Sequence, residues 1–380
     1  MVVAVLQVLL LLVVLGVTFG CGTQEGGSEE STKDEVNKEE STQEKADQLS
    51  TKEAVGQMFV VGMNGTQPDY YITKMIHERN IGGVILTGPN IASLTQTQTL
   101  VSDLQKLSME SSASIPLLIA VDEEGGSVTR APWIPPQPAA AVVGQTGDPG
   151  SAYKVADTVG QNLKEAGINT DLAPVVDTGF GAAIGDRSFG TDPNLVSRMG
   201  RAAIEGFEAA DIASAAKHFP NHGPADQDSH VGSPIIGHDA STLEAQDLPP
   251  FKAAVDEGVP MVMVGHLIYP TIDPTLPASL SPTTIRLLRE NLRFEGVIIT
   301  DALNMEGAKR GGTVAQAAVE AVGAGADMLL LSAEPQEQAD AYEAVVQAVE
   351  KGQISQEQIN QSVERILRLK ERYHVWPTKS

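Results

Sequence analysis

Short apolar runs alternate with longer amphipathic segments along the chain from about residue 53 onward. The apolar runs are rich in Val, Ile, Leu and Ala and have the length of buried strands. They lie at 57–62, 82–86, 116–122, 170–176, 212–218, 261–266, 296–301 and 327–332. The segments of helical length lie at 69–79, 91–110, 151–166, 194–210, 241–257, 281–292, 313–324, 334–351 and 355–373.

This alternation predicts parallel strands that are joined by right-handed helical crossovers. Eight strand–helix units in about 330 residues fit an α/β fold of the (β/α)8 TIM-barrel type. We therefore expect residues 53–380 to form a single catalytic domain. An open, doubly wound sheet is the alternative architecture.

The N-terminus has the pattern of a targeting segment. Residues 1–20 are apolar and uncharged, and Cys21, the only cysteine, follows directly. An apolar run that ends in Gly-Cys resembles a bacterial lipoprotein signal, so residues 1–21 are predicted to be a signal segment with a lipidated Cys21. The start lacks Lys or Arg and residues 18–20 are atypical of such signals. The alternative is an uncleaved anchor or signal helix.

Residues 22–52 contain nine acidic and four basic residues and almost no large apolar side chain. Such a segment cannot bury enough surface to fold, so we expect a disordered acidic tether. The protein would then be exported and held at the outer face of the cell membrane by Cys21. This anchor would be its only contact with the membrane.

Composition narrows the choice of partners. The formal net charge is −23 and no stretch of the sequence is basic, which argues against nucleic acid as a partner. One cysteine excludes an intramolecular disulfide and a thiolate metal cluster. A small neutral or polar substrate is unaffected by these arguments.

The predicted strand ends are unusually polar. In a barrel of this type, chemistry lies at the carboxyl ends of the strands. Five consecutive strands end in a carboxylate, a lysine or a histidine: DEEGG at 122–126, Asp177, KHFP at 217–220, His266 and Asp301. Together these side chains predict a polar pocket.

The segment KHFPNHGPADQDSH at 217–230 is the richest in chemistry. His218 and His222 are four residues apart, as in helical zinc pairs, but Pro220 lies between them and disfavours a helix. We therefore expect a loop and no metal. Asp228 and His230 are two residues apart, so in an extended loop the carboxylate can bond one imidazole nitrogen. The other nitrogen is then free to donate or accept a proton.

Asp301 stands alone at the tip of the apolar strand GVIIT. A carboxylate there can attack, or stabilise, a developing cation in the pocket. A nucleophilic carboxylate together with a separate proton donor is what retaining glycoside cleavage requires.

Four segments carry a resemblance to a known family. DEEGGSVTR, IGDRSFGTDP, KHFPNHG…DSH and GVIITDALNM resemble the signature segments of glycoside hydrolase family 3, over about residues 54–372. Specifically, they are similar to the β-N-acetylglucosaminidases that act on peptidoglycan fragments. The sequence departs from the usual pattern at Asn221 (usually Gly), at Pro224-Ala225 (usually Asp-Thr) and at Glu123 (commonly Gln).

The resemblance implies a role for each site residue. Asp301 is expected to be the nucleophile that forms a covalent glycosyl-enzyme, and His230 the acid/base that Asp228 orients. The hydroxyls and the N-acetyl group of the sugar are expected to be held by Asp122, Arg130, Arg187, Lys217, His218 and His222. An imidazole acid/base predicts activity nearer neutrality than two carboxylates would.

The expected reaction is release of terminal N-acetylglucosamine from cell-wall muropeptides or oligosaccharides, with retention of configuration. We expect no metal or organic cofactor, and a monomer. One alternative is an N-acetylglucosaminide phosphorylase, since a histidine acid/base would not repel phosphate. An alternative of another class is a sugar-binding lipoprotein, which would need two lobes and a hinge.

Overall fold

The computed structural model describes residues 42–332 and 334–375. The predicted signal, Cys21 and residues 22–41 of the predicted tether lie outside the described residues. Within them, no helix combines the length and apolarity needed to cross a bilayer.

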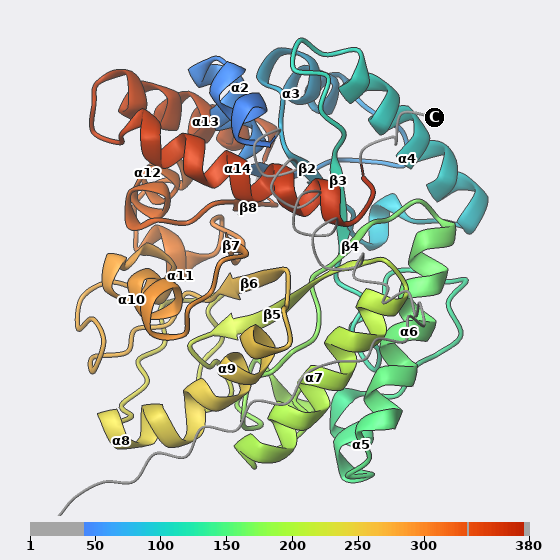
Figure 1. Cartoon of the computed structure of the whole chain (residues 1–380), viewed down its shortest axis with the longest axis vertical. Helices are drawn as coiled ribbons and strands as arrows, with labels where there is room; N and C mark the ends of the chain where they lie inside the picture. Colours follow the sequence, from blue (N-terminus) through green and yellow to red (C-terminus); the bar gives the residue numbers. More distant parts are fainter. Residues whose placement is uncertain (1–41, 333, 376–380) are drawn as a thin grey trace, which may run out of the picture. The chain divides into compact units, whose positions relative to one another are not determined.

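Eight parallel strands form the centre of the domain (Figure 1). They are β1 (Phe59–Gly62), β2 (Gly83–Ile85), β3 (Leu118–Val121), β4 (Thr170–Asp171), β5 (Ala213–Phe219), β6 (Met261–Val264), β7 (Val297–Thr300) and β8 (Leu329–Leu331). Their order is β7-β6-β5-β4-β3-β2-β1-β8, so each strand pairs with its neighbours in sequence and β1 also pairs with β8. The end strands β7 and β8 meet where the Thr300 amide donates to the Met328 carbonyl over 3.0 Å. The (β/α)8 barrel prediction is confirmed.

Helices surround the strands and connect them. They are α2 (Thr51–Gln57), α3 (Tyr70–Arg79), α4 (Leu94–Met109), α5 (Ala140–Gln145), α6 (Pro149–Glu165), α7 (Pro193–Ala209), α8 (Ala240–Thr242), α9 (Leu248–Asp256), α10 (Pro282–Arg286), α11 (Glu306–Lys309), α12 (Val314–Ala324), α13 (Pro335–Glu350) and α14 (Gln356–Arg372). Shorter 3₁₀ turns are η1 (Gly88–Asn90), η2 (Gly185–Arg187) and η4 (Ala278–Leu280), and π-helical turns are η3 (Leu243–Asp247) and η5 (Leu287–Asn291).

Local sequence specifies where many of these helices begin. Asp148 and Asp192 accept backbone amides at the starts of α6 and α7, and a proline occupies the first helical position of each. Proline suits that position because its missing N–H would have no helical partner. Thr313 and Gln316 form a reciprocal capping box at the start of α12.

The structure differs from the predicted elements in places that have a physical cause. Regular pairing of the fourth strand is limited to Thr170–Asp171, because Pro174 has no N–H with which to continue the ladder. The chain still follows β5, since the Val176 amide donates to the Lys217 carbonyl over 2.9 Å. The predicted helices 241–257 and 281–292 each contain a π-helical turn.

The folded domain also begins earlier than expected. Residues 42–48, which we assigned to the tether, are helical, and Ala46 is fully buried in the core. Helix α2 then begins at Thr51. Residues 42–52 therefore belong to the barrel domain.

Candidate active site

All nine residues predicted to act or bind at the site line one cavity at the carboxyl ends of the strands. Its volume is about 360 Å³. The nine are Asp122, Arg130, Arg187, Lys217, His218, His222, Asp228, His230 and Asp301. They come from four different segments of the chain, so the barrel topology brings them together.

Asp301 follows β7 and lies at the cavity wall. Its Oδ1 accepts the backbone N–H of Ala302 over 2.7 Å. Burial acts to raise the pKa of Asp301, but the imidazoles of His266 and His218 and the Ala302 N–H outweigh it and hold the pKa at about 2. The carboxylate is therefore ionised at any pH in which the protein works, as a nucleophile must be.

His266, which follows β6, helps to fix the position of Asp301 through a bond to the next residue in the chain. It is fully buried, and its Nε2 is 3.0 Å from the carbonyl oxygen of Ala302. The hydroxyl of Ser279 bonds its Nδ1 over 2.7 Å. His266 thus fixes the residue that directly follows the carboxylate.

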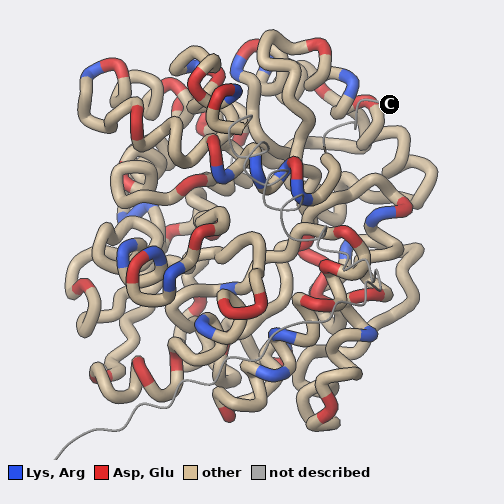
Figure 2. The backbone as a smooth tube through the Cα atoms, viewed as in Figure 1, with Lys and Arg blue, Asp and Glu red and all other residues tan. Residues whose placement is uncertain are grey.

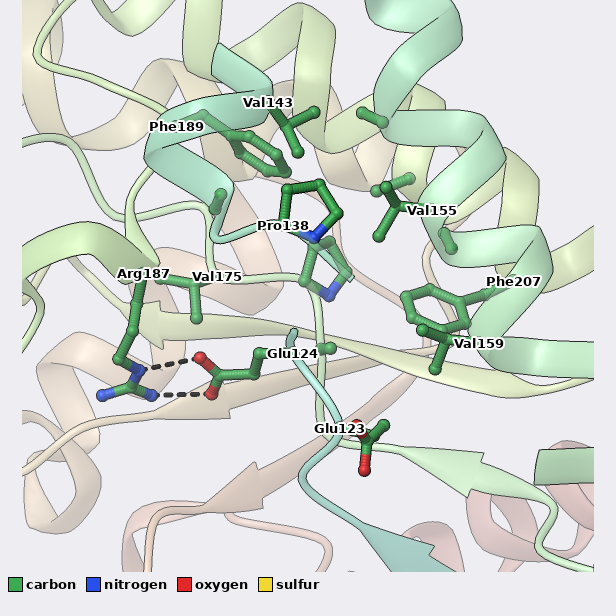
Figure 3. A pocket seen from close by; sticks show the side chains of 16 residues that line it. Glu123, Glu124, Pro138, Val143, Val155, Val159, Val175, Arg187, Phe189 and Phe207 are labelled. Carbon is green, nitrogen blue, oxygen red and sulfur yellow. Dashed lines mark hydrogen bonds and ion pairs between the residues drawn. The ribbon is translucent and has the colours of Figure 1, made fainter. Parts of the chain in front are cut away.

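Lys217, on β5, is the centre of a buried ion network. Its Nζ lies 2.6 Å from Oδ1 of Asp122 and 2.7 Å from Oε1 of Glu124. Arg187 donates two parallel hydrogen bonds to Glu124, from Nε to Oε2 over 2.7 Å and from Nη2 to Oε1 over 2.8 Å (Figure 3). Such bidentate pairs are strong and directional.

The network sets the charge state of its members. Burial acts to raise the pKa of Glu124, yet Lys217 and Arg187 lower it to about 2. Burial acts to lower the pKa of Lys217, and Asp122 and Glu124 overcome this and raise it. Both cations and the Glu124 carboxylate are therefore charged in the folded protein. The sequence placed Asp122, Arg187 and Lys217 at the site with roles, but it gave none to Glu124, which joins two of them.

A small, mostly apolar cavity of about 40 Å³ is also lined by Glu124 and Arg187. Figure 3 shows Val143, Phe189 and Phe207 around it, with the Glu124–Arg187 pair at one edge. One side of the ion pair therefore borders apolar side chains, where electrostatic interactions are stronger than in water.

Asp177, from the end of the fourth strand, organises the two histidines of the loop. It is fully buried and accepts the His222 amide over 2.6 Å and Nδ1 of His218 over 2.7 Å. The bond to Nδ1 leaves Nε2 of His218 available to a ligand. The sequence placed Asp177 at the pocket without a role, and the structure shows it to be a positioning residue.

His222 is buried and lies in the cavity lining. Its Nε2 is 3.1 Å from the Ser229 hydroxyl, whereas Nδ1 has no hydrogen-bond partner among the described residues. Burial lowers the pKa of His222, which favours the neutral ring. His222 therefore lines the cleft as a ring whose Nδ1 is left without a partner among the described residues.

Asp228 and His230 form the dyad that their spacing predicts. Oδ1 of Asp228 lies 2.7 Å from Nδ1 of His230 and accepts the His230 amide over 3.0 Å. The His230 side chain is 71% exposed, so its Nε2 can exchange protons with solvent at the mouth of the cleft. Arg130 also lies at the edge, and buried Glu123 accepts its backbone N–H over 2.6 Å.

Asn221 replaces the usual glycine of the resembled motif and is held by many contacts. It is 1% exposed, and its Oδ1 accepts the amides of Thr178 and Gly223 over 3.0 and 2.9 Å. Its Nδ2 donates to Oδ1 of Asp247 over 2.7 Å, and its carbonyl accepts the Tyr269 hydroxyl over 2.6 Å. The departure at Asn221 therefore anchors the loop that carries His218 and His222.

The described residues contain no group of three or more His, Cys, Asp and Glu side chains placed to hold a metal ion. Two of the histidine nitrogens that a helical zinc pair would use are already engaged, one by Asp177 and one by Ser229.

A parallel barrel with a carboxylate and a separate proton donor in one polar cleft is compatible with retaining glycoside cleavage. The sequence profile of the glycosyl hydrolase family 3 N-terminal domain matches residues 42–369. The chain belongs to glycosyl hydrolase family 3, as the sequence predicted.

Curated proteins similar to this chain are β-hexosaminidases by name. β-Hexosaminidase A of Pseudoalteromonas piscicida is 34% identical over 329 residues, covering 79% of this chain and 54% of that protein. The β-hexosaminidase of Neisseria gonorrhoeae is 36% identical over 266 residues, which are 67% of this chain and 72% of that one. The chain thus spans about half the length of the first relative and nearly three quarters of the second.

Solved structures of similar proteins have the same fold as this chain. A family 3 β-N-acetylglucosaminidase from Paenibacillus sp. FPU-7 superposes with a TM-score of 0.85 and 38% identity, over 87% of this chain and 64% of that chain. The β-N-acetylhexosaminidase of Beutenbergia cavernae gives a TM-score of 0.79 and 30% identity, over 85% of this chain and 99% of that chain.

Proposed function

We propose that the protein is a retaining β-N-acetylhexosaminidase that releases terminal N-acetylglucosamine from muropeptides. The observation that carries this proposal is an ionised, half-buried Asp301 in the same cleft as the Asp228–His230 dyad. The names of the relatives, which are β-hexosaminidases and a β-N-acetylglucosaminidase, support the sugar.

In the first step Asp301 attacks the anomeric carbon, and the glycosidic bond breaks. Nε2 of His230 gives its proton to the departing oxygen while Asp228 holds Nδ1 and stabilises the imidazolium that precedes this transfer. In the second step His230 takes a proton from water, whose oxygen displaces Asp301 from the sugar. Two inversions at one carbon give net retention.

The remaining polar side chains are suited to hold the sugar. Lys217, Arg187, His218 and His222 offer donors or acceptors to the hydroxyls and the acetamide, and Asp122 can accept from hydroxyls. Because Lys217 and Arg187 are tied to Glu124, their positions are set before the substrate arrives.

A time course on 4-nitrophenyl N-acetyl-β-glucosaminide, beside the β-glucoside, tests the reaction class. We expect release from the N-acetyl substrate, no effect of EDTA, and no rate increase with phosphate. Formation of N-acetylglucosamine 1-phosphate would identify a phosphorylase instead. Tight sugar binding without turnover by the intact protein would favour a sugar-binding lipoprotein.

Two variants test the mechanism. Asp301→Asn removes the nucleophile, and full activity of this variant would refute the covalent route. His230→Ala leaves attack on an activated aryl glycoside intact but removes the base of the second step. The glycosyl-enzyme should then accumulate, and mass spectrometry should find the sugar on the peptide that contains Asp301.

The same proposal includes a lipid anchor at Cys21 that holds the protein at the outer face of the membrane. Its support is the apolar segment before the only cysteine. Labelling cells with a palmitate analogue should mark the wild-type protein and leave Cys21→Ser unmarked. Turnover of N-acetylglucosaminyl-anhydro-MurNAc with and without stem peptide tests the aglycone.

A further inference from the structure

A second large cavity lies at the opposite end of the barrel from the catalytic cleft. It has a volume of about 330 Å³ and is formed by residues 258–260, by residues 293–297 and by one face of α14. Residues 258–260 precede β6 and residues 293–296 precede β7, whereas the catalytic side chains follow their strands. We name this cavity the basal arginine groove.

The groove gathers positive charge in an acidic protein. The chain carries a net charge of −23 and twelve arginines, and four of these, Arg293, Arg365, Arg368 and Arg372, line the groove. Glu295 is the one acidic residue among those that line it. Figure 2 shows Lys and Arg positions grouped along α14.

Three of these arginines lie within residues 365–372, a segment that the sequence analysis did not single out. Arg365, Arg368 and Arg372 are spaced by three and four residues, which places them on one face of α14. Arg293 comes from the loop before β7 and adopts a left-handed φ of 57°. Only the fold brings these two segments together.

One of the four arginines, Arg365, has a clear structural role, which is to neutralise a buried carboxylate. Arg365 lies 3.0 Å from Oδ1 of the fully buried Asp327, which Arg289 also pairs. Arg372 pairs with a half-exposed Glu208, and exposed pairs of this kind contribute little.

Arg368 and Arg293 have even fewer interactions that would stabilise the fold. Arg368 pairs with Glu364 of its own helix, and Arg293 has neither an ion pair nor a side-chain hydrogen bond among the described residues. Of the four, Arg293 alone therefore has no carboxylate partner among the described residues, and a bound anion would compensate its charge.

The groove fits a phosphate group in particular. A guanidinium presents a planar fork that matches two phosphate oxygens, and the four arginines have N–H groups that their partners do not use. Val255, Val259, Phe294 and Leu369 supply an apolar wall for an organic part. The volume is in the range of small-molecule sites, about 300–1,000 Å³.

We propose that the basal arginine groove binds a phosphate ester of a small polyol or sugar. The ester is either a free monoester or a unit of a phosphodiester polymer. Because the groove lies at the far end of the barrel, binding there leaves the catalytic cleft open. A polymer held in the groove would keep the enzyme beside its matrix while the cleft works on sugars.

Isothermal titration of the full-length protein tests this inference. The probes are glycerol 3-phosphate, a glycerol-phosphate oligomer and, as the uncharged control, glycerol. We expect one of the two phosphates to bind and its affinity to fall with added salt. The Arg293→Ala/Arg368→Ala variant should weaken binding by about tenfold or more, since two charge-assisted contacts are lost.

Arg198→Ala is the matched control, because Arg198 is exposed on α7 and does not line the groove. It should bind as the wild type does. All variants should keep wild-type activity on the aryl N-acetylglucosaminide, which shows that the barrel is intact and separates this inference from the proposed activity.

The outcomes are distinct. A stronger response to the monoester identifies a free metabolite as the ligand, and a stronger response to the oligomer identifies the polymer. The inference is wrong if neither phosphate binds. It is also wrong if binding survives in Arg293→Ala/Arg368→Ala, because the phosphate would then occupy another site such as the catalytic cleft.

Discussion

Replacing Asn221 by alanine should destabilise the domain and slow catalysis together. The alanine side chain cannot accept the amides of Thr178 and Gly223, which bond Oδ1 over 3.0 and 2.9 Å. It also cannot donate to Asp247, whose Oδ1 is 2.7 Å from Nδ2. The hydroxyl and the carbonyl of Thr178 lose the Nδ2 donor as well, so five polar groups lose a partner at a position that is 1% exposed.

The magnitude follows from the groups that are left without a partner. Each buried group left without a partner costs about 1–3 kcal/mol, and water that enters the space recovers part of this. We expect a loss of about 3 kcal/mol in the free energy of unfolding. For a domain of roughly 330 residues this corresponds to a fall of about 4 °C in Tm.

Catalysis should suffer because Asn221 lies between His218 and His222. The amides of both histidines bond Asp177, so a shift of this loop moves two groups that face the cleft. A displacement of this kind far from the chemistry can cost one or two orders of magnitude, and we expect kcat/KM to fall by about tenfold.

Urea denaturation and steady-state kinetics measure both effects. Asn194→Ala serves as a control, since Asn194 is exposed and, among the described residues, its side chain makes one long bond, to Asp192. Asn221→Gly, the residue usual in the motif, should be destabilised like Asn221→Ala. A loss below about 1 kcal/mol with unchanged kinetics in both Asn221 variants would refute the reasoning.

Three further predictions concern other buried or paired groups. Glu124→Gln removes the carboxylate that pairs with Arg187. We expect the free energy of unfolding, measured by chemical denaturation, to fall by about 3 kcal/mol, and kcat/KM to fall as well. Asp228→Ala should reduce kcat at least about a hundredfold, because His230 loses its orienting partner. The Tm of Asp228→Ala should stay near the wild-type value, since the pair is exposed. A clear fall in Tm beside the fall in kcat would argue against a purely catalytic role. Burial lowers the pKa of Lys370 from 10.5 in the unfolded chain to about 7 in the folded protein. Between pH 7 and pH 10.5 the Lys370 amine is therefore protonated more often in the unfolded chain than in the folded one. Wild-type stability should therefore rise from pH 7 towards pH 10, and Lys370→Met should be more stable by about 3 kcal/mol at pH 7, an advantage that shrinks as the pH rises.

The barrel was readable from the sequence because each unit is specified locally. Apolar runs of strand length, helical periodicity and end signals such as Asp192-Pro193 lie within short stretches. The order of the strands then follows, because short right-handed crossovers place consecutive parallel strands side by side. Exact bounds were less accessible, as in the fourth strand, where Pro174 ends the regular ladder early.

The site was predictable to the extent that it depends on strand ends. Asp301 and Lys217 follow from the rule that carboxyl ends of barrel strands face one pocket, and the Asp228–His230 pair follows from its spacing. The roles of Glu124, Asp177 and Asn221 did not follow. Each acts on a partner that lies tens of residues away in the chain, and Lys217 and Asp122 themselves are 95 positions apart.

The sequence by itself therefore determined the elements, their order and which residue types stand at the catalytic end of the barrel. These are properties of contiguous segments and of the handedness of their connections. The tertiary structure alone decided which carboxylate holds which cation, that Asn221 anchors the histidine loop, and that four arginines meet at the opposite end. Those contacts depend on distances between side chains from remote segments, which packing sets and no local pattern encodes.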